Sequence, residues 1–467
     1  MSTVENQDRT KIPLRRIIGL PTSILLLAGI MIGSGVFKKI APMSRSLMSE
    51  HYILIVWIAA GVISMFGAFL YSGLASLTDK TGGTYEYLRI MYGDFIAFLL
   101  GWTIFTIIGS GSVAALAFVF SQSVDSLFHF KDILPSLSDV SVGNFIYPFR
   151  GFSVKILAVV MIILLTLYNI SGIKNSGKLS NIVTTAKIVG MLLLIIAGFL
   201  YTEEPASALH GVTSFHSLRG AALYSGIFGA LLSALWAFDG WTTISFVTGE
   251  IKNPERNLPY AIIGGVGLVT VLYVLLNYTY MRVFTVEQLA AIPDNRIAAA
   301  TVSETLFGRA GSALIKTLIT VSTFGALNGC IIAYPRISFR MAQEKAFFRR
   351  AAFVHPLYHT PYMAITYTCI WSCILVISGT FDQLTDMVVV AGYMFVILTA
   401  AGLIKMKMQK KMTKKIMGYP VIPVVVILFS LTFVTTTFIV NTRASFVGLL
   451  LTLSGVPFYF WFKKRKV

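Results

Sequence analysis

A run of glycines interrupts the first strongly apolar segment of the chain. Residues 27–37 read LAGIMIGSGVF, so three glycines and a serine stand where a membrane-buried helix should be most regular. Glycine weakens a helix, but small residues also allow close helix–helix packing, and the stretch alone favours neither reading. A break would free the N–H groups of Ile32, Gly33, Ser34 and Gly35. Beside the positive dipole end of the next half-helix, these groups would bind an anion such as a carboxylate.

A second interruption lies in the apolar run 222–248, where the sequence reads WAFDGW from Trp236. Carbonyl groups freed at Trp236, Ala237 and Phe238 would lie at the C-terminal end of a half-helix and accept hydrogen bonds from an ammonium group. Interrupted spans at corresponding positions of two five-span halves favour an inverted-repeat transporter with its site at the bilayer midplane. The two half-sites together would bind an α-amino acid.

Two ionisable residues also lie inside apolar runs. Lys187 could snorkel to the nearby membrane surface, but a central lysine costs roughly 2.5 to 3.5 kcal/mol, which favours an internal polar site. Its ammonium group could replace a bound sodium ion or carry a coupled proton. Asp239 is either a structural group satisfied by N–H donors of the broken helix or a counter-charge for an ammonium-bearing substrate. Trp236 and Phe238 are packing aromatics or, at the lip of the break, a cap that gates the cavity.

Membrane-spanning helices must position these residues. Hydrophobic residues form 56% of the 467 residues and charged residues 12%, and the apolar runs have the length of about 20 residues that crosses a bilayer. We therefore predict an all-α polytopic membrane protein with about twelve transmembrane helices. The expected spans are 17–40, 51–77, 94–123, 152–172, 183–201, 222–248, 259–283, 310–338, 361–379, 385–404, 419–440 and 444–461.

The positive charge indicates how the chain is oriented. The net charge of +18 is gathered in short clusters between apolar runs, so the lipid bilayer and not a nucleic acid is the expected partner. The positive-inside rule predicts a cell-membrane protein whose N- and C-termini are both cytoplasmic, with Lys38, Lys39 and Arg45 as exceptions. We expect a cytoplasmic segment at 1–16, a transport core at 17–404, a basic loop at 405–418, the last two spans within 419–461 and a basic tail at 462–467.

The sequence contains no motif for catalysis or for a cofactor. None of the six histidines forms a metal-binding helical pair, and there is neither a Gly-x-Ser-x-Gly elbow nor a phosphate-binding glycine loop after a strand. Cys369 and Cys373 could share a helix face and bind a metal ion, but they have no histidine or carboxylate neighbours to complete the site. All three cysteines lie in apolar runs, so no structural disulfide is expected. We expect no metal, no cofactor and no enzymatic activity.

Five motifs in order resemble those of the L-type amino acid transporter family, within the amino acid-polyamine-organocation superfamily, and of its bacterial serine/threonine exchangers in particular. The resemblance covers nearly the whole chain. The motifs are GIMIGSGVF at 29–37, TGGTYEY at 81–87, WAFDGW at 236–241, TGEIKNPERNLP at 248–259 and STFGALNGCIIAYPR at 322–336. The family implies a five-plus-five inverted repeat, a LeuT-like core, with two additional C-terminal helices.

The resemblance also implies roles for particular residues. Gly33, Ser34 and Gly35 would bind the substrate carboxylate, the backbone from Trp236 to Asp239 the amino group, and Trp236 would be the gating aromatic. Lys187, near Ser322, matches a lysine that replaces sodium in sodium-independent members.

The expected function is sodium-independent exchange of neutral L-amino acids such as serine or threonine by alternating access. Proton-coupled symport and an amino acid-sensing receptor with the same fold are the alternatives. Eukaryotic members attach to a glycoprotein heavy chain through a cysteine between spans three and four, and residues 124–150 contain none. No disulfide-linked heavy chain is therefore expected.

Overall fold

The structure is a computed structural model of the chain, and it describes residues 16–75, 77–78, 82–128, 130–141, 147–201, 220–293, 297–412, 416–440 and 442–464. Within these residues the regular structure is helical, apart from one isolated bridge between Ile18 and Ile251. Eleven helices of the described chain are long and apolar enough to cross a membrane. A further apolar helix, α16 (Tyr362–Ser378), coincides with the expected ninth span. The prediction of an all-α polytopic membrane protein is confirmed.

The helices follow the expected spans closely. In chain order they are α2 (Leu20–Met31), α3 (Gly35–Lys38), α4 (Ile40–Leu47), α5 (Glu50–Leu74), α6 (Thr84–Tyr92), α7 (Asp94–Thr103), the π-helix η1 (Ile104–Ile108), α8 (Gly109–Phe128), α9 (Phe152–Ile170), α10 (Ile173–Leu200), α11 (Gly220–Phe238), the 3₁₀ segment η3 (Thr243–Glu250), α12 (Pro254–Val283), α13 (Val286–Ala290), α14 (Ala298–Ala333), α15 (Pro335–Gln343), the 3₁₀ turn η4 (Arg349–Ala352), α16, α17 (Phe381–Met408), α18 (Val421–Val440), α19 (Thr442–Leu453) and α20 (Gly455–Lys464).

Several boundaries differ from the expected ones. The helix of the eighth span begins at Ala298, twelve residues before the expected start at position 310, and Gly308 bends it with a φ of 65°. Helix α17 continues to Met408 and α20 to Lys464, so the first residues of the expected basic loop and basic tail are helical. Residues 1–15, 413–415 and 465–467, which belong to the expected terminal segments and loop, lie outside the described residues.

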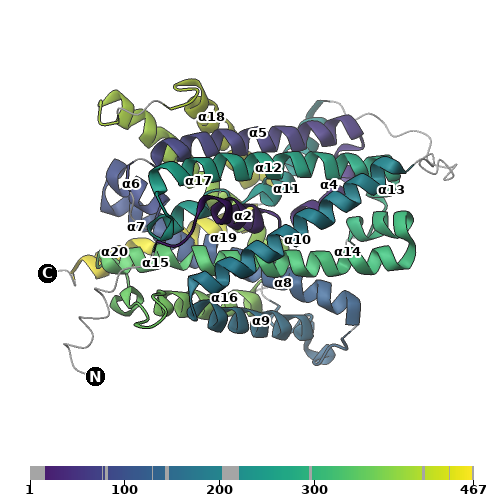
Figure 1. Cartoon of the computed structure of the whole chain (residues 1–467), viewed down its shortest axis with the longest axis horizontal. Helices are drawn as coiled ribbons and strands as arrows, with labels where there is room; N and C mark the ends of the chain where they lie inside the picture. The colour runs from purple at the N-terminus through teal and green to yellow at the C-terminus, as the bar shows by residue number, and fades with distance from the viewer. Residues whose placement is uncertain are drawn as a thin grey trace.

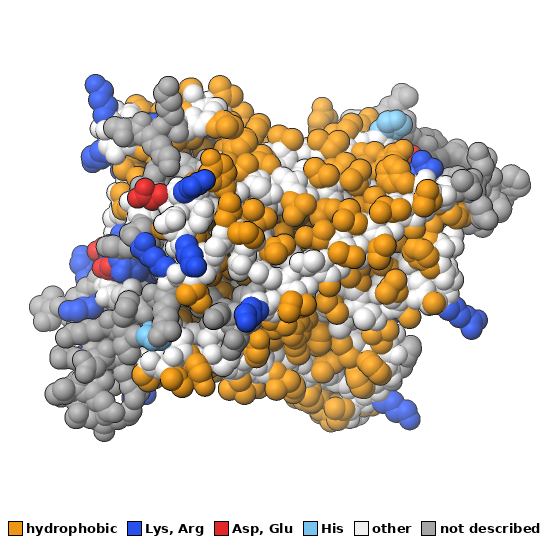
Figure 2. Space-filling view, viewed as in Figure 1, with side chains coloured by type: hydrophobic (Ala, Val, Ile, Leu, Met, Phe, Trp, Pro, Cys, Tyr) orange, Lys and Arg blue, Asp and Glu red, His pale blue; other side chains and the backbone are white. Residues whose placement is uncertain are grey.

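The helices form one bundle whose two ends differ in charge. In Figure 1, α6, α15 and α20 lie at the left end and α13 at the right end. We call these the α6 end and the α13 end. Figure 2 shows a broad hydrophobic band between the two ends, with charged side chains gathered at the ends and more of them at the α6 end. Such a band is the surface expected where lipid covers the protein.

The interrupted helix α2 lies inside this bundle. Its main neighbours are α12, α10 and α14, and the short α3 that continues its path contacts α11 and α14. Seven of its twelve residues are buried, in the continuous stretch from Leu26 to Met31 and at Ser23. Because protein surrounds the break on these sides, the backbone groups that it frees face other protein groups or a cavity and not lipid.

Candidate functional site

The first helix break lies between Met31, the last residue of α2, and Gly35, the first of α3. The N–H of Ile32 donates to Ala28 O at 2.8 Å, and that of Gly33 donates to Met31 O at 2.8 Å. These two N–H groups, which the sequence analysis expected to be free, are therefore used within the backbone. The N–H groups of Ser34 and Gly35 have no hydrogen-bond partner in the described part of the chain. The donors at this break are thus fewer than expected.

The second break follows Phe238, where α11 ends and the chain turns before η3. Gly240 has a φ of +104°, and a Cβ there would lie 2.7 Å from Ile30 Cγ2, so glycine suits both the backbone and the space. The N–H of Asp239 donates to Trp236 O at 3.1 Å. The carbonyl of Trp236 is therefore engaged, whereas that of Phe238 has no hydrogen-bond partner within the described residues.

A narrow cavity of about 20 Å³ lies between the two breaks. It has room for about one water molecule and is far smaller than the roughly 300–1,000 Å³ of small-molecule sites, so the walls must move apart to admit a substrate. The residues that line it come from both breaks and from α8 and α14: Ile30, Met31, Gly33, Ser34, Gly35, Ser112, Leu116, Trp236, Ala237, Asp239, Cys330 and Tyr334. The structure thus brings together six of the eight expected substrate-binding residues, whereas Ile32 and Phe238 are buried outside the cavity wall.

Polar side chains from both breaks line this cavity and can form further hydrogen bonds. The Ser34 hydroxyl is buried and has no hydrogen-bond partner among the described residues. On the other side, the Asp239 carboxylate accepts a hydrogen bond from the N–H of Gly240, and no lysine or arginine of the described chain forms an ion pair with it. The first observation fits the structural reading of Asp239 and the second fits the counter-charge reading, so both stay open.

Lys187 points into the protein. Its Nζ, on α10, donates to Gly29 O and to Ile32 O, both at 2.7 Å, and the side chain is completely buried. The Ser322 hydroxyl donates to the same Ile32 carbonyl at 2.9 Å and lies 3.2 Å from Gly33 O. The snorkelling reading is wrong, because the ammonium group lies against the C-terminal end of α2. That end carries the negative pole of the helix dipole, which attracts a cation.

Tyr273, on α12, joins the two breaks and was missed by the sequence analysis. Its hydroxyl lies 2.8 Å from Met31 O and 3.0 Å from Ala237 O, and the side chain is fully buried. The Ala237 carbonyl, expected to be free for an ammonium group, is therefore engaged by the protein. A tyrosine in the middle of the apolar run 259–283 is the signal that could have found it, because a buried phenol hydroxyl needs a partner.

The glycines of the first break also allow close packing. A Cβ on Gly35 would lie 2.5 Å from Ala237 Cβ and 2.7 Å from Ala237 Cα, and one on Gly29 would lie 2.2 Å from Thr184 Oγ1. Atoms cannot approach this closely, so a Cβ on Gly35 would have to move the backbone of Ala237, whereas one on Gly29 would have to turn the Thr184 side chain. The two readings of the glycine run are therefore both right: the helix is broken, and its glycines let neighbouring elements touch it.

Aromatic and basic residues lie between the cavity and the α13 end. The ring of Trp236 meets that of Phe381 edge to face, with centroids 6.1 Å apart. The Nζ atoms of Lys38 and Lys39 each lie 5.7 Å from the centroid of the same Phe381 ring, within the range of a cation–π interaction. Arg45 donates to Ile292 O at 2.9 Å beyond α13. These contacts give the three exceptions to the positive-inside pattern a local role.

At the α6 end, a buried ion pair lies beyond the second break. Arg336 Nε lies 2.8 Å from Glu250 Oε1, and both side chains are almost completely buried. The pair joins α15 to the last residue of η3. Removing one partner of such a pair lowers the free energy of unfolding by about 3–5 kcal/mol, because the other charge is left uncompensated. It therefore holds these elements together while it is intact.

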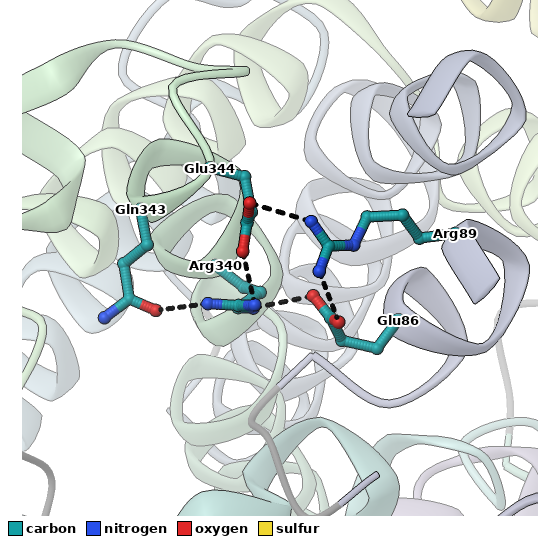
Figure 3. Close-up of polar contacts among 5 residues, drawn as sticks. All are labelled: Glu86, Arg89, Arg340, Gln343 and Glu344. Carbon is teal, nitrogen blue, oxygen red and sulfur yellow. Dashed lines mark hydrogen bonds and ion pairs between the residues drawn. The ribbon is translucent and has the colours of Figure 1, made fainter. Parts of the chain in front are cut away.

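A second cluster, the four-charge cluster, comprises Glu86, Arg89, Arg340 and Glu344 (Figure 3). Arg340 Nε lies 2.6 Å from Glu86 Oε1, and Arg89 lies 3.2 Å from Glu86 Oε2 and 2.7 Å from Glu344 Oε2. Arg340 also pairs with Glu344 and donates to Gln343 Oε1 at 3.2 Å. Two positive and two negative charges balance, and they tie α6, between the second and third spans, to the end of the eighth.

Comparison with known proteins shows the family of the chain. The serine/threonine exchanger SteT of Bacillus subtilis (strain 168) is 29% identical over 458 residues, which cover 97% of this chain and 98% of the relative. The human b(0,+)-type amino acid transporter 1 is 30% identical over 467 residues, with 99% and 91% covered. The mouse large neutral amino acids transporter small subunit 2 is 27% identical over 457 residues, with 96% and 81% covered. Because a profile of the amino acid permease family matches residues 18–461, the chain belongs to that family.

Proposed function

We propose that this chain is a sodium-independent exchanger of small neutral L-amino acids, working by alternating access. The observation that carries the proposal is the cavity between the two helix breaks, which has unused N–H donors on one side and acceptor groups on the other. An α-amino acid in water carries a carboxylate and an ammonium group a few bonds apart, so it complements both sides at once. Relatives over nearly the full length are named as amino acid exchangers or transporters.

The first break supplies the donors for the substrate carboxylate. In this proposal the N–H groups of Ser34 and Gly35 and the hydroxyl of Ser34 bind the two carboxylate oxygens. Gly33 leaves the space that the carboxylate needs, since a Cβ there would already lie 3.2 Å from Leu116 Cδ2. Ile32 contributes indirectly. Its carbonyl accepts hydrogen bonds from Lys187 and Ser322, and these bonds fix the turn between α2 and α3.

The second break supplies acceptors for the ammonium group. Asp239 lines the cavity, so we propose its carboxylate as the acceptor. The Phe238 carbonyl is unused but lies outside the cavity wall, so it would join only if the break rearranged around the substrate. The carbonyls of Trp236 and Ala237 are engaged with Asp239 and Tyr273 in the present conformation. We propose that Trp236 is the gating aromatic, because it lines the cavity and its ring rests on Phe381 toward the α13 end.

Sodium independence follows from the place of Lys187. The carbonyl oxygens at the C-terminal end of α2 would otherwise form a cation site, since several carbonyls converge there at a negative helix pole. The Lys187 ammonium group lies 2.7 Å from two of them, Gly29 O and Ile32 O. We propose that the Lys187 ammonium group stabilises these carbonyls in place of a bound sodium ion, and that Ser322 donates to the Ile32 carbonyl beside it.

Exchange requires that the protein with bound substrate switch between its inward-open and outward-open states more readily than the protein without substrate. The two broken helices contact each other at Gly35 and Ala237, so a substrate bound to both would couple their movement. At the α6 end, the Arg336–Glu250 pair and the four-charge cluster close the bundle. We propose that substrate binding offsets the cost of opening these contacts, because a ligand shifts an equilibrium by its difference in affinity for the two states.

The relatives are named for different amino acids, so we propose the substrate class from the size of the cavity. The cavity has a volume of only about 20 Å³ in the present conformation, so a substrate with a small side chain requires the least movement of its walls. We therefore propose serine and threonine as substrates, the pair named for the bacterial relative. A cationic substrate is the alternative that the unpaired Asp239 would favour.

We place the α6 end in the cytoplasm of the cell, with both termini on that side of the cell membrane. The lysine and arginine side chains that gather at this end in Figure 2 support the proposal under the positive-inside rule. We further propose that the chain works without a disulfide-linked heavy chain. The mouse relative is named as a small subunit, but residues 124–150 of this chain contain no cysteine, and its three cysteines lie within helices.

The test is uptake of radiolabelled serine, threonine and leucine into proteoliposomes that contain the purified chain. Vesicles are loaded with unlabelled amino acid or left empty, with sodium and pH matched on both sides. We expect rapid uptake only into loaded vesicles, no change when choline replaces sodium, and faster uptake of serine and threonine than of leucine. Uptake into empty vesicles that needs a proton gradient would replace exchange by symport, and binding without any uptake would favour a receptor.

A further inference from the structure

The α6 end carries more positive charge than its ion pairs use. The four-charge cluster is neutral, and Arg336 is matched by Glu250. The chain between α15 and α16 then adds exposed basic residues that have no carboxylate within 4.0 Å in the described chain. These residues are Lys345, Arg349 and Arg350. Helix α20, whose aromatic residues pack against this segment, ends with the exposed Lys463 and Lys464.

A wide cavity opens beside these cations. Its volume is about 820 Å³, and its wall includes both Lys345 and Arg349 together with Phe347, Phe348 and Phe462. The rings of Phe348 and Phe462 meet edge to face with centroids 5.4 Å apart, so they form one continuous wall. A cavity with cations on one side and aromatic rings on the other suits a ligand with an anionic and an apolar part.

An apolar groove continues from this cavity along α16. Its lining consists entirely of aromatic and aliphatic residues, and its volume is about 250 Å³. The lining residues are Phe105, Phe348, Tyr367, Ile370 and Trp371. Phe348 belongs to both walls and is 39% exposed, so cavity and groove meet at its ring. The polar N–H of Trp371 donates to Thr106 O at 2.9 Å, so this ring presents only apolar surface to the groove.

The groove runs into the membrane from the end at which the cations lie. Helix α16 begins at Tyr362, so Tyr367 and Trp371 lie roughly 8 and 14 Å along it at a rise of 1.5 Å per residue. Ile370 is 54% exposed on this face. The order from the end of the bundle inward is therefore cations, aromatic rim and apolar groove, which is also the order of phosphate and acyl chain in a phospholipid leaflet.

We propose that this cavity and groove bind one anionic phospholipid, with its phosphate beside Lys345 and Arg349 and an acyl chain along Phe348, Tyr367 and Ile370. Charge complementarity selects an anionic headgroup over a zwitterionic one. The groove selects a lipid over a free phosphate ion, because a phosphate ion would leave the exposed aromatic rim unused. Basic residues that only fixed the orientation of the chain would need neither the cavity nor the groove.

The experiment uses the purified full-length chain in detergent and native mass spectrometry with phosphatidylglycerol, phosphatidylcholine and inorganic phosphate as the probes. We expect phosphatidylglycerol to bind with a defined stoichiometry and at least tenfold more tightly than phosphatidylcholine. The double substitution Lys345→Gln/Arg349→Gln should weaken this binding about 25-fold, since each basic residue near an anionic lipid contributes about fivefold. Both side chains are exposed, so the variant should fold normally.

The matched control is Lys131→Gln/Arg150→Gln, which removes the same charge from two exposed positions between α8 and α9. It should bind phosphatidylglycerol as the unchanged protein does. In a separate variant, Ile370→Trp should fill the groove and weaken phosphatidylglycerol binding without changing any charge. Equal binding of the two lipids, or equal losses in the two double variants, would overturn the proposal. Inorganic phosphate that competes at the affinity of the lipid would do the same, because the site would then be a phosphate site.

Discussion

Gly35→Ala tests whether close contact between the two broken helices is needed for transport. The added Cβ would lie 2.5 Å from Ala237 Cβ, whereas ordinary contacts begin at 3.4 Å, so α3 and the end of α11 would have to separate by about 0.9 Å. Both neighbouring atoms are at or next to the backbone, so no flexible side chain can yield. The substitution therefore changes the distance between the two half-sites and adds no charge or polar group.

The expected effect is large for a single methyl group. Overpacking of this kind costs about 1–3 kcal/mol, and a misplacement of about 1 Å at a positioned site can cost on the order of 100-fold in rate. We therefore expect exchange to fall about ten- to a hundredfold. The reason is that a substrate bound to one break would no longer reach the groups of the other in the right geometry.

The assay is serine counterflow into proteoliposomes, with reconstituted protein quantified and its monodispersity checked by size-exclusion chromatography. Gly264→Ala is the matched control: it makes the same change on α12, where a new Cβ would meet only Ile24 Cδ1 at an ordinary 3.7 Å. The control should transport at the unchanged rate. Wild-type counterflow in Gly35→Ala would refute the reasoning, since the helices could then separate without loss.

Three further substitutions test other parts of the site. Lys187→Ala should abolish counterflow while the protein still inserts, because the buried Gly29 carbonyl loses its donor at about 1–3 kcal/mol and the Ile32 carbonyl keeps only the Ser322 hydroxyl; normal uptake would remove the lysine from the mechanism. Gly33→Leu should also abolish counterflow, since its side chain would collide with Leu116 and fill the cavity, and residual binding measured by scintillation proximity would contradict this. Glu250→Gln should destabilise the protein by about 3–5 kcal/mol by leaving Arg336 uncompensated, and an unchanged melting temperature would show the pair to be dispensable.

The helical architecture was largely predictable because hydropathy determines it. Lipid allows only helices or closed barrels to cross, so each apolar run of about 20 residues had one reading. The prediction of a transporter of the L-type family and not an enzyme is likewise confirmed by the family match and the relatives. The boundaries were less predictable. Helices such as α14 and α17 extend beyond the apolar runs, and an early start at Ala298 leaves no hydropathy signal.

Side-chain partners at the site were less predictable than the breaks themselves. Glycine and aspartate in apolar runs marked both interruptions, but the sequence did not show which freed backbone groups would be engaged inside the protein. Tyr273 on α12 reaches the Met31 carbonyl of α2, which lies far away along the chain, as well as the Ala237 carbonyl, and the four-charge cluster joins α6 to the end of the eighth span. Such contacts depend on how helices dock, which periodicity does not encode.

The tethered ammonium of Lys187 has a consequence for what the protein can achieve in a cell. A sodium ion that enters from outside and leaves inside delivers the free energy of its own gradient, whereas a lysine side chain never leaves the protein. Under the proposed exchange, the only driving force is then the concentration ratio of another amino acid. At steady state, the inside-to-outside ratio of one substrate would equal that of its exchange partner. Such a protein would rebalance the composition of the cellular amino acid pool and leave its total size unchanged.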